Sequence, residues 1–237
     1  MQNRLYTGKA KEVWSTSDPE IVKIVYLDQV TALNGKQKTE MKNKGKINNE
    51  ISTLIFEFLN AHNIPTHYLK TLSPTEELVK KVEIIPLEMI TRNYSAGHFT
   101  SKFNIAEGIK LTPAVEEMCY KNDQLDDPAI NESQAVALNI VTYEELQKMW
   151  RLSRKVNELL TKLFDQANFQ LVDFKLEFGR TSNDKIILAD EFSPDNCRLW
   201  DKTTQQRFDK DVYRKNTGDL VSTYQNVLTR LKNVLGE

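Results

Sequence analysis

The clearest alternation of apolar and polar positions lies between residues 172 and 178. Four apolar residues alternate there with three charged ones, Asp173, Lys175 and Glu177. A period of two is typical of a strand with one buried face, and it predicts that the three charged side chains share the other face. Turn-forming residues follow at 179–184, and then comes the largely apolar segment 185–190. We therefore expect a hairpin that brings Asp190 towards the charged face.

A second strand-like region lies near the start of the chain. The segment Tyr6–Trp14 contains Gly8, and a polar turn separates it from Ile21–Tyr26. This pattern predicts a glycine-containing hairpin in which Lys9 and Lys11 lie on one face because they are two residues apart. Such a hairpin can fold over a triphosphate. A pair of surface lysines is the alternative.

Apolar spacing of three and four residues predicts three helices. The first runs from Ile47 to roughly His62 and should pack on the first sheet. The second opens at a capping box, Thr142–Glu145, and the last runs from about Leu220 to Leu235. Their apolar stripes are expected to be core. Between the first two helices we expect strands over residues 65–72, 77–84 and 87–91, broken by Pro74 and Pro86.

Three polar segments lie between these elements. Residues 28–36 are predicted to form a loop, with a turn signal at Asn34-Gly35. Most of the lysines at positions 36–46 are predicted to lie in a solvated segment. Residues 92–98 hold small residues at a junction after a strand, where backbone N–H groups could bind an anion with Arg92 at the mouth. A tight turn with an incidental arginine is the alternative. Residues 121–128 read as a surface loop.

Composition narrows the functional classes. The 237 residues, enough for one large domain or two lobes, are 27% charged and 40% hydrophobic with a net charge of −1, which gives no reason to expect nucleic-acid or membrane binding. No apolar run approaches a membrane span, and residues 1–6 lack the apolar core of a signal peptide, so we expect a cytoplasmic location. Cys119 and Cys197 form no CxxC pair, and the histidines show no metal-ligand spacing.

The carboxylates of the central hairpin raise the possibility of a metal site. Carboxylates that converge from neighbouring strands are costly unless a cation binds there. Magnesium usually takes one or two carboxylates plus substrate phosphates, so Glu177 and Asp190 would suit a nucleotide-bound ion. The pattern alone favours an exposed hairpin with cross-strand ion pairs through Lys175. Ser193–Asp195 then leaves the strand by a rigid turn, and Arg198 should lie close enough to grip a phosphate or carboxylate.

Short motifs along the whole chain resemble those of the SAICAR synthetase family, in the family's order. They are Gly8-Lys9-Ala10-Lys11, Thr31-Ala32 with Asn34-Gly35, Arg92-Asn93 with Ala96-Gly97, Asp127-Pro128, Asp173 to Gly179, Asp190 to Asp195, Arg198 to Asp201, and Asp209-Lys210-Asp211. Each is weak alone, but the ordered set is specific. The family usually has a serine where this chain has His98, so His98 must donate in its place if that hydroxyl touches substrate.

The resemblance implies an activity and a fold. The activity is the ATP-dependent condensation of L-aspartate with 5-amino-1-(5-phosphoribosyl)imidazole-4-carboxylate, giving SAICAR, ADP and phosphate in de novo purine biosynthesis. An acyl phosphate formed from the ATP γ-phosphoryl would be attacked by the aspartate amine. The fold is α+β, with an antiparallel N-terminal lobe over residues 1–85 and a larger C-terminal lobe over residues 86–237, similar to kinases and ATP-grasp enzymes. A homodimer is also implied.

The resemblance further implies a division of roles around the nucleotide. The phosphates would be held by Lys9, Ala10 and Lys11 of the hairpin. The adenine cleft would be bordered by the segment from Lys80 to Glu83. Magnesium would be held by Glu177 and Asp190.

The implied substrate side contains the remaining charged motif residues. Arg92, Arg198 and His98 would bind the ribose phosphate and the substrate carboxylates, with Lys175 nearby. Asp173 and Asp195 are both possible acceptors for the amine proton, and the sequence does not select between them.

Two other functional classes remain open at this point. A small-molecule kinase could use the same lysine hairpin and carboxylate pair, and it would form ADP without aspartate. A nonenzymatic nucleotide-binding module would tolerate Glu177→Gln with little change beyond metal affinity, whereas an enzyme should lose most turnover.

Overall fold

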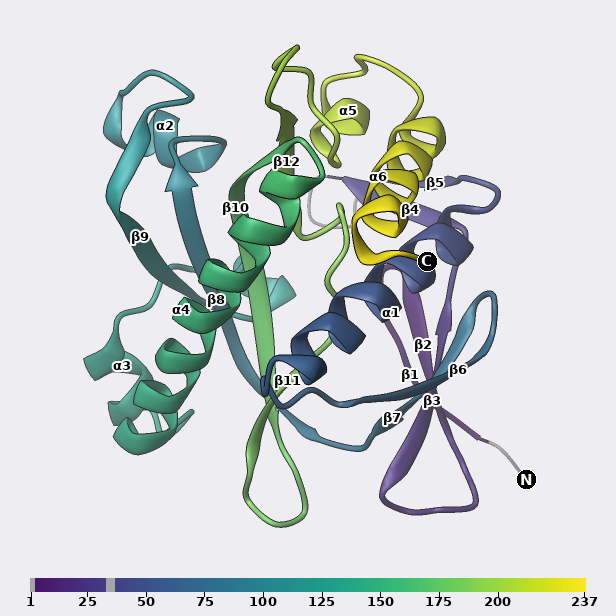
Figure 1. The fold of residues 1–237 in the computed structure, drawn as a ribbon. Coiled ribbons are helices and arrows are strands. Elements are labelled where there is room, and N and C mark those ends of the chain that lie inside the picture. Colours follow the sequence, from purple (N-terminus) through teal and green to yellow (C-terminus); the bar gives the residue numbers. More distant parts are fainter. Residues whose placement is uncertain (1–2, 33–36) are drawn as a thin grey trace.

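The computed structural model describes residues 3–32 and 37–237, which form an α+β fold with antiparallel sheets (Figure 1). The first sheet has the order β1 (Arg4–Thr7), β2 (Lys11–Ser15), β3 (Ile21–Tyr26), β7 (Glu76–Lys80), β6 (Tyr68–Ser73). The expected N-terminal hairpin is therefore present. Its glycine segment, residues 8–10, joins β1 to β2, so Lys9 lies in the turn and not beside Lys11 on a strand face.

The second sheet is built around β10, as the alternating segment predicts. Its strands are β11 (Ile186–Ala189), β10 (Phe169–Arg180), β8 (Glu83–Tyr94) and β9 (Lys110–Tyr120), and β12 (Cys197–Asp201) also pairs with β10. Glu177 lies opposite Ala189, which confirms the hairpin and places Asp190 directly after it. The strand continues through Gly179, which was expected in the turn. A Cβ there would lie 2.5 Å from Cγ2 of Val82, so the close approach requires glycine.

The expected break at Pro86 is wrong, because β8 runs through it. The register between β8 and β10 shifts between the pairs Glu177 with Glu88 and Gly179 with Ile84. Such an irregularity accommodates a residue that cannot donate a ladder hydrogen bond. The strand also extends to Tyr94, beyond its predicted end, so Arg92 belongs to β8 and does not follow the strand at the mouth of a helix.

The segment after β3 also differs from its prediction. Residues expected in a loop form β4 (Gln29–Ala32), which pairs with β5 (Gln37–Glu40). The Asn34-Gly35 turn signal and Lys36 lie outside the described residues. Lys38, Lys42 and Lys46 are exposed as expected, but Lys44 is 1% exposed, so the solvated interpretation is wrong for this lysine.

The helices are α1 (Lys44–Ala61), α2 (His98–Phe103), α3 (Glu132–Ala137), α4 (Tyr143–Gln166), α5 (Asp211–Arg214) and α6 (Leu220–Leu235), with a 3₁₀ turn at Asp123–Leu125. Three of them, α1, α4 and α6, follow the predicted apolar stripes, and three short ones, α2, α3 and α5, were not among the helices predicted from apolar spacing. The capping box of α4 is confirmed: Thr142 Oγ1 accepts from the Glu145 N–H, and Glu145 accepts from the Thr142 N–H. No helix in the described ranges is long and apolar enough to cross a bilayer.

The largest apolar core lies between the helices and the second sheet and includes Tyr68 of β6 from the first sheet, whereas Val22, Ile24, Tyr26 and Val79 form a separate cluster within the first sheet. The large core contains Ile55 of α1, Phe164 of α4, Phe174 of β10 and Leu228 of α6. Helix α1 packs against α6, and α4 packs against β10 (Figure 1). The core therefore fixes α1 and the second sheet relative to each other, and the chemistry-bearing residues lie on the elements around it.

Candidate functional site

Two adjoining cavities contain most of the predicted site residues. The first, of about 420 Å³, has an apolar wall that includes Val22, Ile24 and Val79 of the first sheet, and it is charged elsewhere. The second, of about 350 Å³, is lined mainly by polar and charged side chains. The two share Lys175 and Asp195, so they are neighbouring parts of one site.

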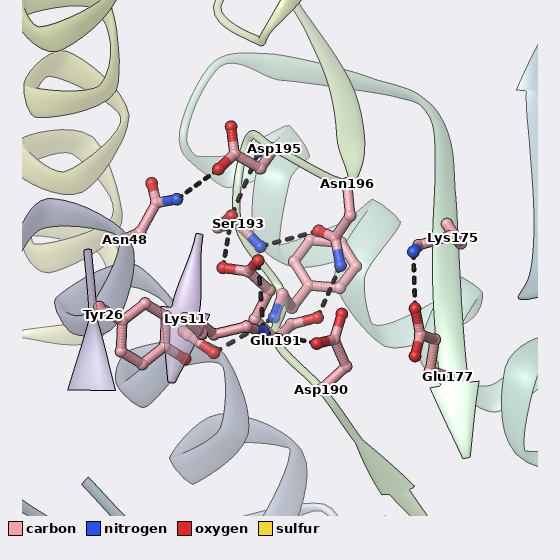
Figure 2. A network of polar contacts seen from close by, with 12 residues as sticks. Lys11, Tyr26, Asn48, Lys175, Glu177, Asp190, Glu191, Ser193, Asp195 and Asn196 are labelled. Atoms are coloured by element: carbon pink, nitrogen blue, oxygen red, sulfur yellow. Dashed lines mark hydrogen bonds and ion pairs between the residues drawn. The ribbon is translucent and has the colours of Figure 1, made fainter. Parts of the chain in front are cut away.

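Lys11 projects from β2 into the charged part of the first cavity (Figure 2). Its Nζ lies 2.5 Å from Asp190 Oδ1 and 3.4 Å from Glu191 Oε1. Burial opposes its charge, but the two carboxylates outweigh burial and raise the pKa of the amine. Lys9 and Ala10 also line this cavity, and Lys9 Nζ lies 2.8 Å from Asp123 Oδ1.

The predicted metal pair lies in the same cavity. Glu177 is 3% exposed and pairs with Lys175 at 2.7 Å and with Lys121. The exposed-hairpin alternative is therefore wrong, because the charged face of β10 is covered. Burial alone would raise the pKa of Asp190, but Lys11, Lys175 and Lys121 lower it below its ordinary range.

The donor chemistry of these carboxylates suits a magnesium ion that is only partly coordinated by protein. No cluster of three or more His, Cys, Asp or Glu residues with metal-binding geometry occurs among residues 3–32 and 37–237. Glu177 and Asp190 supply hard oxygen donors to one cavity, which fits a magnesium ion that completes its shell with phosphates and water. A complete protein cage is not what this ion requires.

Asp173 brings the two predicted arginines together beside the second cavity. Its Oδ2 accepts from Arg92 Nη1 at 2.7 Å and from Arg198 Nη1 at 2.8 Å. Arg198 also donates from Nε to Asp211 at 2.9 Å, and Arg92 donates to Glu117 at 2.6 Å. The guanidinium groups are thus fixed by carboxylates at the edge of a cavity that suits an anionic ligand.

Gly97 and His98 lie at the start of α2, and Gly97 is close to Arg198. Gly97 has φ +57°, and a Cβ at this position would lie 2.5 Å from Arg198 Nη2. His98 is exposed and is absent from the lining of both cavities. The short helix therefore contributes a close backbone approach to Arg198 here, and not an imidazole.

Asp195, shared by both cavities, is held by groups from two helices. Lys44 and Asn48 of α1 donate to Oδ2, and Tyr224 of α6 donates to Oδ1 at 2.8 Å. Burial would raise the pKa of Asp195, but Lys44 and Lys210 lower it below its ordinary range. The ion pair between Lys44 and Asp195 explains why Lys44 is buried.

Only part of the segment that was predicted to border the adenine cleft, Lys80 to Glu83, lines the first cavity. Lys80 lines the first cavity, together with Lys81 and Val82. The side chain of Glu83 is 78% exposed and lies 3.5 Å from Arg180, and Glu83 is absent from the cavity lining.

Comparisons with known proteins show the family to which the chain belongs. A model of the SAICAR synthetase family matches residues 4–231. The chain is 57% identical over 234 residues to the phosphoribosylaminoimidazole-succinocarboxamide synthase of Limosilactobacillus fermentum, covering 98% of each. The chain belongs to the SAICAR synthetase family. It is accordingly an enzyme of the ligase type, ATP-dependent and of purine biosynthesis.

Solved structures of the SAICAR synthetase family share the fold. The enzyme of Ehrlichia chaffeensis is 42% identical with a TM-score of 0.95, over 97% of this chain and 98% of that one. A SAICAR synthetase in complex with ADP is 38% identical with a TM-score of 0.93, over 96% and 97%.

Several residues that line the first cavity could not be singled out from the sequence pattern. Lys121, Asp123 and Asp127, from the predicted surface loop, line the first cavity, and so does Glu191. Burial, the largest cause, raises the pKa of Glu191, with Lys11 opposing it. The Asp127-Pro128 motif was the available signal for the loop. Glu191 follows Asp190 directly, but nothing in the local pattern shows that both neighbours face the cavity.

Proposed function

We propose that the chain condenses L-aspartate with 5-amino-1-(5-phosphoribosyl)imidazole-4-carboxylate to give SAICAR, ADP and phosphate. The observation that carries this proposal is the adjoining pair of cavities, one suited to a nucleotide and one to an anionic substrate, with Lys175 between them. Transfer of the γ-phosphoryl to the substrate carboxylate then needs only a short step across the shared boundary. The acyl phosphate that results is attacked by the aspartate amine.

The first cavity accounts for the nucleotide. Its apolar wall suits adenine, and Lys9 and Lys11 suit the phosphates. Glu177 and Asp190 would hold a magnesium ion, which would neutralise phosphate charge. Lys175 and Lys121 balance the charge of Glu177.

The second cavity accounts for the substrate anions. Arg92 and Arg198 would bind the phosphate and carboxylates, oriented by Asp173. Asp173 and Asp195 are the two possible acceptors of the proton from the aspartate amine, and we assign this role to Asp173. Both arginine bonds use its Oδ2, whereas both oxygens of Asp195 already accept from Lys44, Asn48 or Tyr224.

The first measurement is ADP release from ATP, magnesium and the carboxylated aminoimidazole ribotide, with and without L-aspartate. The proposal expects release that depends on aspartate and yields the succinocarboxamide. Aspartate-independent release with a stable phosphorylated product would favour a kinase. The absence of release would favour a binding module and refute the assigned roles.

Glu177→Gln tests the carboxylate directly. The substitution keeps the size of the side chain and removes the charge that would hold magnesium, so turnover should fall roughly 100-fold or more. Glu83→Gln is the matched control, because that carboxylate is exposed and lines neither cavity. Equal activity of both variants would contradict the metal assignment.

The homodimer, the boundary between residues 85 and 86, and the likeness to kinases and ATP-grasp enzymes remain proposals from the family resemblance. Sedimentation velocity of the purified chain tests the first of these. A monomer at micromolar concentration would contradict it.

A further inference from the structure

A buried carboxyl group lies in the first sheet next to the wall of the first cavity. Glu77 on β7 is 0% exposed, and it shares a sheet face with Val79, which lines the cavity. Its Oε1 accepts a hydrogen bond from the Tyr26 hydroxyl at 3.1 Å. Its Oε2 has no hydrogen-bond partner in the described part of the chain. An ionised carboxylate with a single bond is a costly group to bury.

Tyr26 connects this carboxyl group to Lys11. The two residues are opposite each other in the β2–β3 register, and Lys11 Nζ lies 5.6 Å from the centroid of the Tyr26 ring (Figure 2). The ring face supports the ammonium group, while the hydroxyl at the far end is held by Glu77. Asp190 and Glu191 contact the same ammonium from the segment after β11.

We propose that Glu77 is a positioning residue for Lys11 and that it performs this role in its uncharged, protonated form. A neutral Glu77 fixes the Tyr26 ring beneath the Lys11 amine without adding a third negative charge to Asp190 and Glu191. An ionised Glu77 would compete with nucleotide phosphates for that amine. The inference rests on the proposed function, in which Lys11 binds phosphate.

Burial and the surrounding charges together set the pH at which this role is lost. Burial is the largest influence and raises the pKa of Glu77 to about 8, with Glu191 and Asp190 acting in the same direction. Lys11 and the Tyr26 hydroxyl act against it. A bound nucleotide neutralises Lys11 and adds negative charge, and both effects raise this pKa further. Proton binding and nucleotide binding therefore favour each other.

Calorimetric titration with ADP and magnesium between pH 7.0 and 9.5 tests the proposal. The affinity of the unaltered chain should fall roughly fivefold to tenfold over this range, corresponding to a pKa change of about one unit on binding. Glu77→Gln cannot ionise, so its affinity should change little with pH. Tyr26→Phe keeps the ring but removes the hydroxyl through which Glu77 holds it, so the affinity for ADP at pH 7 should fall. Because this hydroxyl also stabilises ionised Glu77, the loss of affinity with rising pH should move to higher pH.

Proton uptake provides a readout that a purely structural role would not move. At pH 8.5, titrations in buffers of different ionisation enthalpy should show that the unaltered chain takes up part of a proton with ADP, and that Glu77→Gln takes up less. Equal pH dependence and equal uptake in the two proteins would overturn the proposal. If Glu77→Gln does not fold, an unshifted profile in Tyr26→Phe would overturn it. No ADP binding by the unaltered chain at pH 7 would refute the nucleotide pocket itself, and this proposal with it.

Discussion

At the scale of single residues, Gly97 tests whether Arg198 belongs to substrate binding. Gly97→Ala is strained by the positive φ, and its Cβ would displace the Arg198 guanidinium. Because a charge-assisted hydrogen bond contributes about 1.5–3 kcal/mol, kcat/KM for the aminoimidazole substrate should fall roughly 10- to 100-fold. The affinity for ADP should stay the same, since Gly97 does not line the first cavity.

Gly236→Ala is the matched control for backbone strain. Gly236 also has a positive φ, of +79°, but nothing lies within 4 Å of the added Cβ. It should reduce stability at the end of α6 without changing kinetics. A parallel loss of ADP binding in Gly97→Ala would show general disruption and contradict the assignment.

Single residues were predictable where the argument depended on neighbours in sequence. Alternation placed Asp173, Lys175 and Glu177 on one face, and the hairpin placed Asp190 beside them. The burial of Lys44 was not predictable, because its cause is a carboxylate 151 positions away in the chain. Glu77 looks locally like any charged strand residue, and only the covering of its sheet face makes it unusual.

At the scale of elements, the start of α4 provides a test with a defined pH dependence. Glu145 closes the capping box and also accepts from Arg180 at 2.5 Å and 3.0 Å. The bond from Arg180 is the main cause that lowers the pKa of Glu145 from 4.5 to about 2. A carboxylate whose pKa is lowered by folding stabilises above pH 4.5, and this contribution is lost as the pH falls towards 2.

At pH 7 the free energy of unfolding of Glu145→Gln should therefore be lower than that of the unaltered chain by about 0.5–1 kcal/mol, the contribution of a partly exposed ion pair. The difference should vanish between pH 4.5 and 2, as measured by urea denaturation. Glu144→Gln, at the exposed neighbouring position, should show no such change. A difference that persists at pH 2 would mean that the charge of Glu145 is not its source.

The long helices were predicted well from their apolar spacing. Strands β4 and β8, which depend on pairing with another strand, were not. The buried stripe of α4 and the bounds of α6 follow directly from apolar spacing. Strand β4 contains polar residues and exists because β5 pairs with it. Strand β8 passes through Pro86 because an irregularity in the ladder with β10 tolerates it. Tertiary pairing overrides local signals in both cases.

At the scale of the whole molecule, the two cavities lie where elements from distant parts of the chain meet. The first sheet supplies Lys11 and the apolar wall, the second supplies Glu177, and α1 and α6 hold Asp195 between the cavities. A site assembled in this way exists only when the sheets are fixed relative to each other. The large core provides that connection through α1 and through Tyr68 of β6, both of which pack with the second sheet, while the inner residues of β3 and β7 form a separate cluster.

This connection predicts that the chain unfolds in one cooperative transition and not lobe by lobe. The three tryptophans report on different regions: Trp14 lies in β2, Trp150 in α4 and Trp200 in β12. Each of three variants would retain one tryptophan. Within each variant, the urea midpoint measured by fluorescence should equal the midpoint measured by circular dichroism. ADP at 100 times its Kd should raise the unfolding free energy by about 2.7 kcal/mol in all three. If the variant that retains Trp14 showed a fluorescence midpoint below its circular dichroism midpoint, and the other two variants did not, the first sheet would unfold separately. The shared core would then not couple the two halves of the site.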